Sequence, residues 1–170
     1  EVLAGGGPAD VVELTLALAR EMLAGAGKDD IDPADALTDG RAMDAWRAMI
    51  SAQGGDPDAE LPRAAETQQV TADADGVLTR LDAFQVGVAA WRLGAGRARK
   101  EDPVQAGAGV EWHARPGDAV QVGQPLLTLH TDTPDRFDRA LEALDGAWQI
   151  APDHTAYTSS ALIVDRIAAP

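Results

Sequence analysis

Residues 109–129 read GVEWHARPGDAVQVGQPLLTL, and this stretch decides the fold class. Residues 109–113 and 125–129 are short apolar runs. Between them lie residues 115–118 (RPGD) and the pair Gly123-Gln124, which are residue types that favour tight turns. Short apolar runs bounded by turn residues are typical of β-strands. The stretch therefore predicts two strands joined by tight turns.

The residues on either side add helices and further strands to this half of the chain. The expected helices cover residues 83–93, which end at a glycine pair, and residues 135–150. The expected strands lie around Val70, at residues 76–81 and at residues 161–164. We place a domain boundary at residues 62–67, which separates residues 1–62 from a mixed α+β part, residues 63–170.

The first third of the chain is expected to be helical. Residues 1–4 are typical of the last turn of a helix that begins earlier, because glycines and Pro8 follow them. Apolar spacing predicts helices over residues 8–24 and 41–52, and Asp32-Pro33 is typical of a helix start between them. Short amphipathic helices bury little against one another, so we expect them to carry an exposed apolar patch.

Composition argues against several classes of function. The chain has 28 acidic and 14 basic residues, and its formal net charge of −14 repels nucleic-acid phosphates and anionic lipids. No stretch approaches the roughly 20 apolar residues of a membrane helix, and no signal peptide opens the chain. We therefore expect a soluble, cytoplasmic protein with neither nucleic acid nor membrane as a partner. The absence of cysteine excludes disulfides, zinc–thiolate sites and a cysteine nucleophile.

Several short segments, in order along nearly the whole chain, resemble the C-terminal region of the pyrimidine-nucleoside phosphorylase family. They are GPAD (7–10), EML (21–23), AQGGD (52–56), LPRA (61–64), ADGV (74–77), LGAGRARKED (93–102), VEWH (110–113), GDAV (117–120) and Gly123. No single segment is decisive. Their order and spacing carry the resemblance.

The resemblance implies an enzyme of nucleoside salvage that splits a pyrimidine nucleoside with inorganic phosphate into the free base and a pentose 1-phosphate. The family's phosphate-binding and base-binding residues lie upstream of this region, so we expect no catalytic, substrate-binding or metal-binding residue here. We also expect no cofactor, with phosphate as a co-substrate, and no activity of this piece alone. The full-length enzyme would be a homodimer.

The resemblance also implies a division of the fold. Residues 1–62 would be the closing helices of a larger α/β domain, and residues 63–170 a hammerhead-like, barrel-sandwich α+β domain. Two questions stay open: whether a separate polypeptide supplies the upstream half, and whether thymidine alone or also uridine is the substrate.

The sequence offers one clustered set of anion-binding groups, whereas phosphorolysis needs donors around both the phosphate and the departing base. This set is a glycine-rich loop formed by Gly94, Gly96, Arg97, Arg99 and Lys100. Glycines let backbone N–H groups converge on an anion, but these glycines follow a helix whose C-terminal carbonyls disfavour one. We favour a structural or interdomain-contact loop and retain, as the alternative, a loop that closes over the active site.

A second class of function is a biotinyl- or lipoyl-like carrier module, because residues 117–126 resemble the hairpin of such domains. A carrier needs an exposed lysine at a tight turn soon after that strand. The only lysines are Lys28 and Lys100, which disfavours this alternative.

The remaining polar and aromatic residues indicate no site. The three histidines (His113, His130 and His154) lack the short-spaced pairs of a metal site. Ser159 and Ser160 lack a nucleophile-elbow pattern, and residues 29–32 do not match a calcium loop. The four tryptophans (Trp46, Trp91, Trp112 and Trp148) are expected in core or interface packing.

Overall fold

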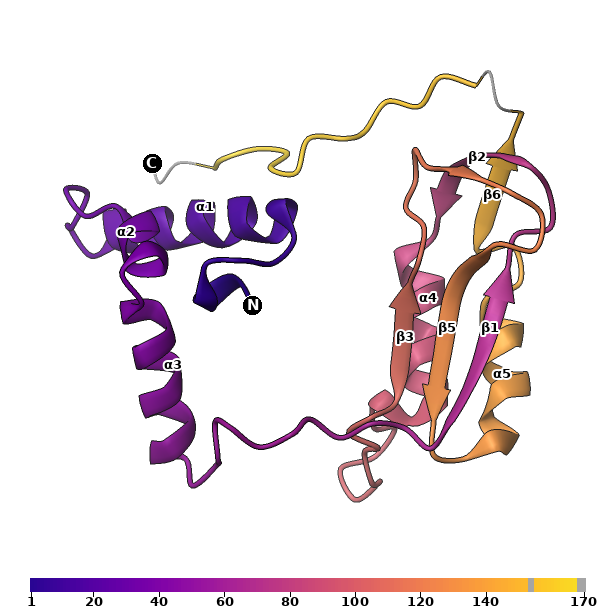
Figure 1. Ribbon diagram of the computed structural model, residues 1–170, viewed down its shortest axis with the longest axis horizontal. Helices are drawn as coiled ribbons and strands as arrows, with labels where there is room; N and C mark the ends of the chain where they lie inside the picture. The colour runs from indigo at the N-terminus through magenta and orange to yellow at the C-terminus, as the bar shows by residue number, and fades with distance from the viewer. Residues whose placement is uncertain (153–154, 168–170) are drawn as a thin grey trace. The chain divides into compact units, whose positions relative to one another are not determined.

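The computed structural model describes residues 1–152 and 155–167 (Figure 1). These residues form two compact units, which are described separately. The helical unit contains residues 1–59 and the segment from residue 160, and the sheet unit contains residues 60–159. None of the helices in the described ranges combines the length and the apolar character needed to cross a bilayer.

The helical unit contains a short 3₁₀ turn and three α-helices. They are η1 (Val2–Ala4), α1 (Ala9–Gly25), α2 (Pro33–Thr38) and α3 (Arg41–Ala52). The Asp32 side chain accepts a hydrogen bond of 3.1 Å from the Ala34 backbone N–H, so it caps α2 as its sequence signature predicts. The helices expected over residues 8–24 and 41–52 are confirmed.

The helices of this unit leave an apolar face uncovered. None of their residues is fully buried. On α1, Val11, Leu14, Leu18 and Met22 recur at helical spacing and are 38–75% exposed. The exposed apolar patch expected from the sequence is therefore present.

The prediction of a strand at residues 161–164 is wrong. The structure gives these residues no regular secondary structure. They belong to the helical unit, where Leu162 and Ile163 line a pocket with Leu14 and Leu18 of α1, and Arg166 pairs with Glu21 at 2.8 Å. A strand requires a neighbouring strand to pair its backbone groups, and the described part of this unit contains only helices.

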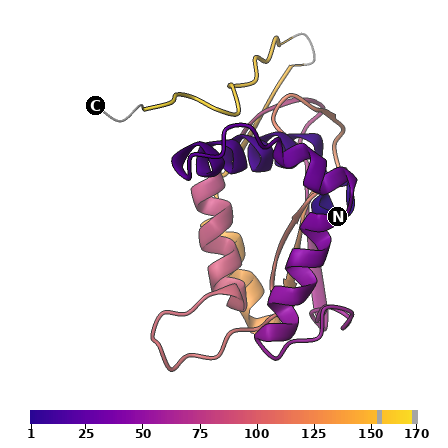
Figure 2. The same cartoon turned by 90° about the vertical axis from the view of Figure 1, so that its left-hand side faces the viewer.

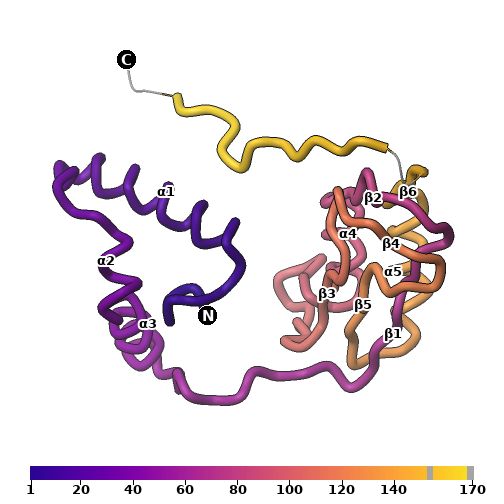
Figure 3. Tube along the Cα trace, turned by 45° about the horizontal axis from the view of Figure 1, so that its top comes forward, coloured from indigo at the N-terminus to yellow at the C-terminus, as the bar shows by residue number. Residues whose placement is uncertain are grey.

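The sheet unit contains two three-stranded antiparallel sheets. In strand order, the first holds β1 (Glu66–Thr71), β5 (Pro125–Thr131) and β3 (Gly109–Trp112), which lie side by side in Figure 3. The second, also in strand order, holds β4 (Ala119–Val120), β2 (Gly76–Leu81) and β6 (Trp148–Ala151). The mixed α+β class expected for this part of the chain is confirmed, as are the strands expected around residues 70, 76–81, 109–113 and 125–129.

Two helices cover one side of the first sheet. They are α4 (Ala83–Ala90), which continues into the π-helical turn η2 (Trp91–Ala95), and α5 (Phe137–Ala143), which follows the 3₁₀ turn η3 (Pro134–Arg136). The two helices pack against each other (Figure 2). The core lies between helices and sheets, and its largest fully buried apolar side chains are Leu78, Leu93, Leu126, Leu127, Leu129 and Leu144.

The helix expected over residues 135–150 is too long. Helix α5 ends at Ala143, and the chain turns at Gly146, whose φ of 67° is readily adopted only by glycine. Beyond it, Trp148 and Ile150 pack against the core while Gln149 is exposed, which is the two-residue alternation of a strand. Strand β6 then pairs with β2, with Trp148 opposite Leu81.

Candidate functional site

The glycine-rich loop predicted as a contact or closure element begins where the α4–η2 helix ends. Gly94 is buried and has a φ of 119°. Its carbonyl accepts a 3.0 Å hydrogen bond from the Gln105 backbone N–H. A Cβ at this position would lie 2.9 Å from the Gln105 side chain and 3.1 Å from an Arg136 guanidinium nitrogen. Glycine is therefore required here, both for the backbone angle and for the space.

The Trp91 indole holds the first part of the loop. Its Nε1–H donates a 3.1 Å hydrogen bond to the Arg97 carbonyl. A Cβ on Gly96 would lie 2.6 Å from the indole ring, so only glycine allows this close approach. The loop is thereby attached to the helix from which it emerges.

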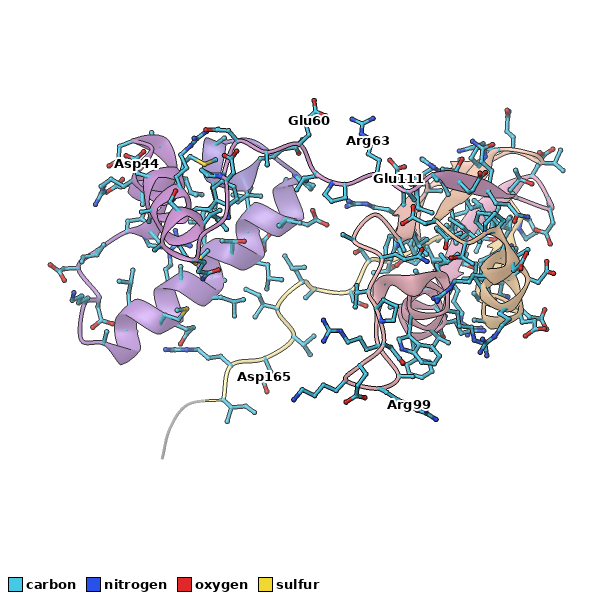
Figure 4. The ribbon with its side chains drawn as sticks, turned by 90° about the horizontal axis from the view of Figure 1, so that it is seen from below. Asp44, Glu60, Arg63, Arg99, Glu111 and Asp165 are labelled. Carbon is cyan, nitrogen blue, oxygen red and sulfur yellow. The ribbon has the colours of Figure 1, made fainter. Side chains whose placement is uncertain are left out.

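The tip of the loop is closed around a carboxylate of its own. Asp102 Oδ2 accepts hydrogen bonds from the backbone N–H groups of Ala98 (3.1 Å) and Arg99 (2.8 Å). These amides are therefore already occupied and do not form an open anion-binding nest. The Arg97, Arg99 and Lys100 side chains are exposed, and Figure 4 shows Arg99 extending outward from the loop.

The far end of the loop is fixed through Gln105 to the residues that directly follow strand β5. The Gln105 side-chain amide donates to Thr133 Oγ1 at 2.8 Å, and its Oε1 accepts from the Asp132 backbone N–H at 2.8 Å. The fully buried Thr131 hydroxyl donates to the Leu93 carbonyl at 2.7 Å. Both ends of the loop are thus anchored, and its basic tip protrudes from the unit (Figure 2).

Beside the loop lies a pocket of about 370 Å³, which we call the arginine pocket. Its charged lining was not predicted from the sequence. Its lining consists of Trp91, Arg92, Gly96, Ala98, Asp102, Pro103, Arg136 and Arg139. Three of these residues are arginines, and Arg92 and Arg139 are 47 residues apart in sequence. They meet here because α4–η2 packs against α5. The one sequence signal was the i, i+3 spacing of Arg136 and Arg139, which is too common to indicate a site.

The arginine from η2 is hydrogen-bonded to helix α5, whereas the two arginines from η3 and α5 have no acidic partner in the part of the chain that the structure describes. The Arg92 guanidinium donates to the Arg139 backbone carbonyl at 2.5 Å and lies 3.5 Å from Glu142 Oε2. Within the described residues, the side chains of Arg136 and Arg139 form no ion pair within 4.0 Å.

Two of the histidines lie apart from this pocket: His130 is on strand β5, and His113 directly follows strand β3. His113 Nε2 is 2.7 Å from Thr128 Oγ1. His130 Nε2 lies 3.5 Å from Glu111 Oε2 and, among the described residues, has no hydrogen-bond partner. His154 lies outside the described residues. The described ranges contain no group of three or more His, Cys, Asp or Glu placed to hold a metal ion.

The tryptophans divide between the core and the surface. Trp148 packs against the core, as expected. Trp91 and Trp112 are 41% and 45% exposed, and Trp91 is the one that lines the arginine pocket.

Neither lysine of the chain lies in the turn that would carry a prosthetic group in a carrier domain. Residues 130–134, at the end of β5 and just after it, are His-Thr-Asp-Thr-Pro. Lys28 follows α1 in the helical unit, and Lys100 lies in the glycine-rich loop. The carrier alternative therefore finds no support.

The sheet unit matches a known class of domain. A family model described as "Pyrimidine nucleoside phosphorylase C-terminal domain" matches residues 77–151, which extend from β2 to β6 and include the loop and the pocket. The similarity to individual proteins extends further, into the helical unit.

Three curated relatives cover most of the chain. It is 54% identical to the thymidine phosphorylase of Mycobacterium tuberculosis over 167 residues, which cover 98% of this chain and 39% of the relative. It is 35% identical to the pyrimidine-nucleoside phosphorylase of Staphylococcus epidermidis over 156 residues (85% and 36%), and 37% identical to that of Bacillus subtilis over 143 residues (78% and 33%). The chain therefore belongs to the pyrimidine-nucleoside phosphorylase family and corresponds to its C-terminal part. It spans about two fifths or less of these relatives' length.

Proposed function

We propose that this chain is the C-terminal part of a pentosyltransferase that splits thymidine or another pyrimidine nucleoside with inorganic phosphate. The products are the free base and a ribose or 2-deoxyribose 1-phosphate, as required for nucleoside salvage. The observation that carries the proposal is the 54% identity to a thymidine phosphorylase over 167 residues, because it extends through both structural units. Phosphate is a co-substrate, and the chemistry needs no cofactor.

The proposed role of this part is structural support and domain closure, with the catalytic residues in the preceding part of the longer enzyme. Phosphorolysis develops negative charge on both the phosphate and the departing base, so it requires two sets of donors. The described pocket gathers one set of cations, and its lining holds no second set for a base. The chain alone is accordingly inactive.

The proposed place of each unit follows from its exposed surface and its sheets. The helical unit completes a larger α/β domain, which would cover the apolar face of α1. The sheet unit, with its two small antiparallel sheets, is a hammerhead-like, barrel-sandwich domain. The full-length enzyme is a cytoplasmic homodimer whose dimer contacts lie mainly outside this chain.

The glycine-rich loop is the proposed contact between this part and the rest of the enzyme. Its ends are anchored by Trp91 and Gln105, whereas Arg97, Arg99 and Lys100 at its tip are exposed. A loop that is anchored at both ends and has a cationic tip is suited to contact an acidic surface when two domains close.

A chimaeric enzyme tests this proposal. The C-terminal part of the Mycobacterium tuberculosis thymidine phosphorylase is replaced by this chain, and phosphorolysis of thymidine and of uridine is followed by release of the base. We expect activity from the chimaera, and reduced kcat with little change in folding when Arg97, Arg99 and Lys100 are all replaced by Gln. A folded chimaera that releases no base from either nucleoside would contradict the proposal.

A further inference from the structure

The arginine pocket concentrates positive charge in a strongly acidic protein. Its lining contains three arginines and one aspartate, and Glu142 lies 3.5 Å from Arg92, so three positive and two negative charges leave a net charge of +1, whereas the whole chain carries −14. Like charges gathered in a partly enclosed space repel one another unless a counter-ion lies between them. The local charge therefore favours an anionic ligand, although the net charge of the whole molecule is negative.

The three guanidinium groups come from three elements, η2, η3 and α5, which pack against one another. Arg92, on η2, is held by its hydrogen bond to the Arg139 backbone carbonyl. Arg136 lies at the end of η3 against Gly94, where a Cβ would come within 3.1 Å of its guanidinium nitrogen. Arg139 is on the first turn of α5. Arg92 and Arg136 are thus placed by contacts at the junction of the helices, whereas the Arg139 side chain is exposed.

The one carboxylate in the lining is already satisfied. Asp102 Oδ2 accepts hydrogen bonds from two backbone N–H groups of the loop, at 2.8 and 3.1 Å. It forms no ion pair with Arg92, Arg136 or Arg139 within 4.0 Å. The donors of Arg136 and Arg139 therefore remain available to an external acceptor, since neither has an acidic partner in the described residues.

We infer that this pocket binds an oxyanion of the phosphate class, held by the guanidinium groups of Arg136 and Arg139 and by the field of Arg92. The planar fork of a guanidinium matches the tetrahedral oxygens of phosphate and can donate two parallel hydrogen bonds to it. A pocket of about 370 Å³ is large enough for more than a bare phosphate ion. The half-exposed Trp91 indole offers a wall for the remainder of a phosphate ester.

The inference goes beyond the proposed phosphorolysis and does not depend on it. The same chemistry would recognise free inorganic phosphate or the phosphate group of a phosphorylated sugar. Two probes separate these sources: sodium phosphate and ribose 5-phosphate. Sodium chloride at matched ionic strength measures non-specific screening.

The test is a titration of the 170-residue chain followed by nuclear magnetic resonance at low salt. The indole N–H resonance of Trp91, assigned through the variant Trp91→Phe, reports on the pocket. We expect a saturable shift with a dissociation constant of about 1 mM for at least one phosphate probe. In the double variant Arg136→Gln/Arg139→Gln the dissociation constant should rise about tenfold or more, because both guanidinium groups that donate to the oxyanion are lost.

A matched control removes the same charge elsewhere. Lys28 and Arg63 are exposed and form no ion pair within the described residues, and Figure 4 shows Arg63 extending away from the backbone. The variant Lys28→Gln/Arg63→Gln should bind the probe within about twofold of the parent chain, because neither side chain lines the pocket and charges outside it are screened by solvent and salt.

The single variant Arg139→Gln keeps the test decisive if the double variant does not fold. The bond from Arg92 goes to the Arg139 backbone carbonyl, so this substitution leaves it in place. Weaker binding in Arg139→Gln with an unchanged amide spectrum supports the site. Equal shifts with chloride and with both phosphate probes overturn it, as does equal binding by Arg139→Gln and the parent chain. Tighter binding of ribose 5-phosphate identifies an ester as the ligand, and binding of inorganic phosphate at least as tight identifies the free ion.

Discussion

Gly94 is the residue on which the geometry of the loop depends most. The variant Gly94→Ala should lose about 1–3 kcal/mol of unfolding free energy, because alanine is strained at positive φ and its Cβ would press on Gln105. The measurement is urea denaturation followed by tryptophan fluorescence. Gly87 is the control, since it lies within α4 with open space at its Cβ position. Gly87→Ala should raise the unfolding free energy by about 0.5–1 kcal/mol. A similar increase for Gly94→Ala would contradict the positive φ described for Gly94.

Asp82 gives the sheet unit a pH-dependent contribution to stability. Its carboxylate caps α4 by accepting a 3.0 Å hydrogen bond from the Gln85 backbone N–H and pairs with Arg80, and both interactions lower its pKa. Because the folded pKa lies below the unfolded value of about 3.9, this stabilisation is fully present above that value and is lost as pH falls through the folded pKa.

The variant Asp82→Asn isolates the charge, since asparagine is also a good N-cap. The parent chain should be more stable than Asp82→Asn at pH 7, and the difference should shrink below about pH 4, where the parent carboxylate takes up its proton. Unfolding free energies measured in urea between pH 2.5 and 7 check this expectation. A difference that stays constant over that range would show that the charge contributes nothing.

At the scale of the element, helix α5 is held by Leu144 at its C-terminal end. This side chain is 1% exposed and belongs to the core. Leu144→Ala should cost about 2–5 kcal/mol of unfolding free energy, because it removes buried methyl groups and leaves a cavity. Val122 is 64% exposed in a turn, so Val122→Ala should change stability by no more than about 0.5 kcal/mol. Equal effects of the two variants in urea denaturation would place Leu144 outside the core.

Sequence patterns predicted the elements best where a local signal marks their ends. Helix α3 was expected over residues 41–52 and has those bounds, and the Asp32 cap marks the start of α2. The helix expected over residues 135–150 was extended too far, because Leu144 and Trp148 also fit helical spacing. The structure of residues 148–151 depends on strand β2, which lies more than 60 residues earlier in the sequence and pairs with them.

The candidate site was predicted only in part for the same reason. The loop residues Gly94, Gly96, Arg97, Arg99 and Lys100 all lie within residues 94–100 and were found from the sequence, although their role stays a prediction. The pocket residues Arg92, Arg136 and Arg139 come together through the packing of α4–η2 on α5. No local sequence signal records that packing, so the pocket was visible only in the structure.

At the scale of the whole molecule, the uncovered face of α1 should govern how the isolated chain behaves. Leu18 and Met22 are 57% and 75% exposed and lie one helical turn apart. We expect the isolated chain to self-associate, and the variant Leu18→Gln/Met22→Gln to raise the dissociation constant about tenfold or more, because each buried apolar side chain contributes roughly 1.5–3 kcal/mol.

Sedimentation velocity over a range of concentrations measures this association. Phe84 on the sheet unit is 79% exposed and provides the control, since Phe84→Gln removes an exposed apolar group from a different surface. A stronger effect of Phe84→Gln than of the α1 variant would place the associating surface on the sheet unit.

The most direct test of the central claim is thymidine phosphorolysis by the purified chain alone and after mixing with the upstream part of the Mycobacterium tuberculosis relative. We expect no release of thymine by either polypeptide alone and measurable release by the mixture, because we propose that this part supplies support and closure and the upstream part the chemistry. Clear activity of the chain by itself would mean that catalytic residues lie within these 170 residues and that its role is not limited to support and closure.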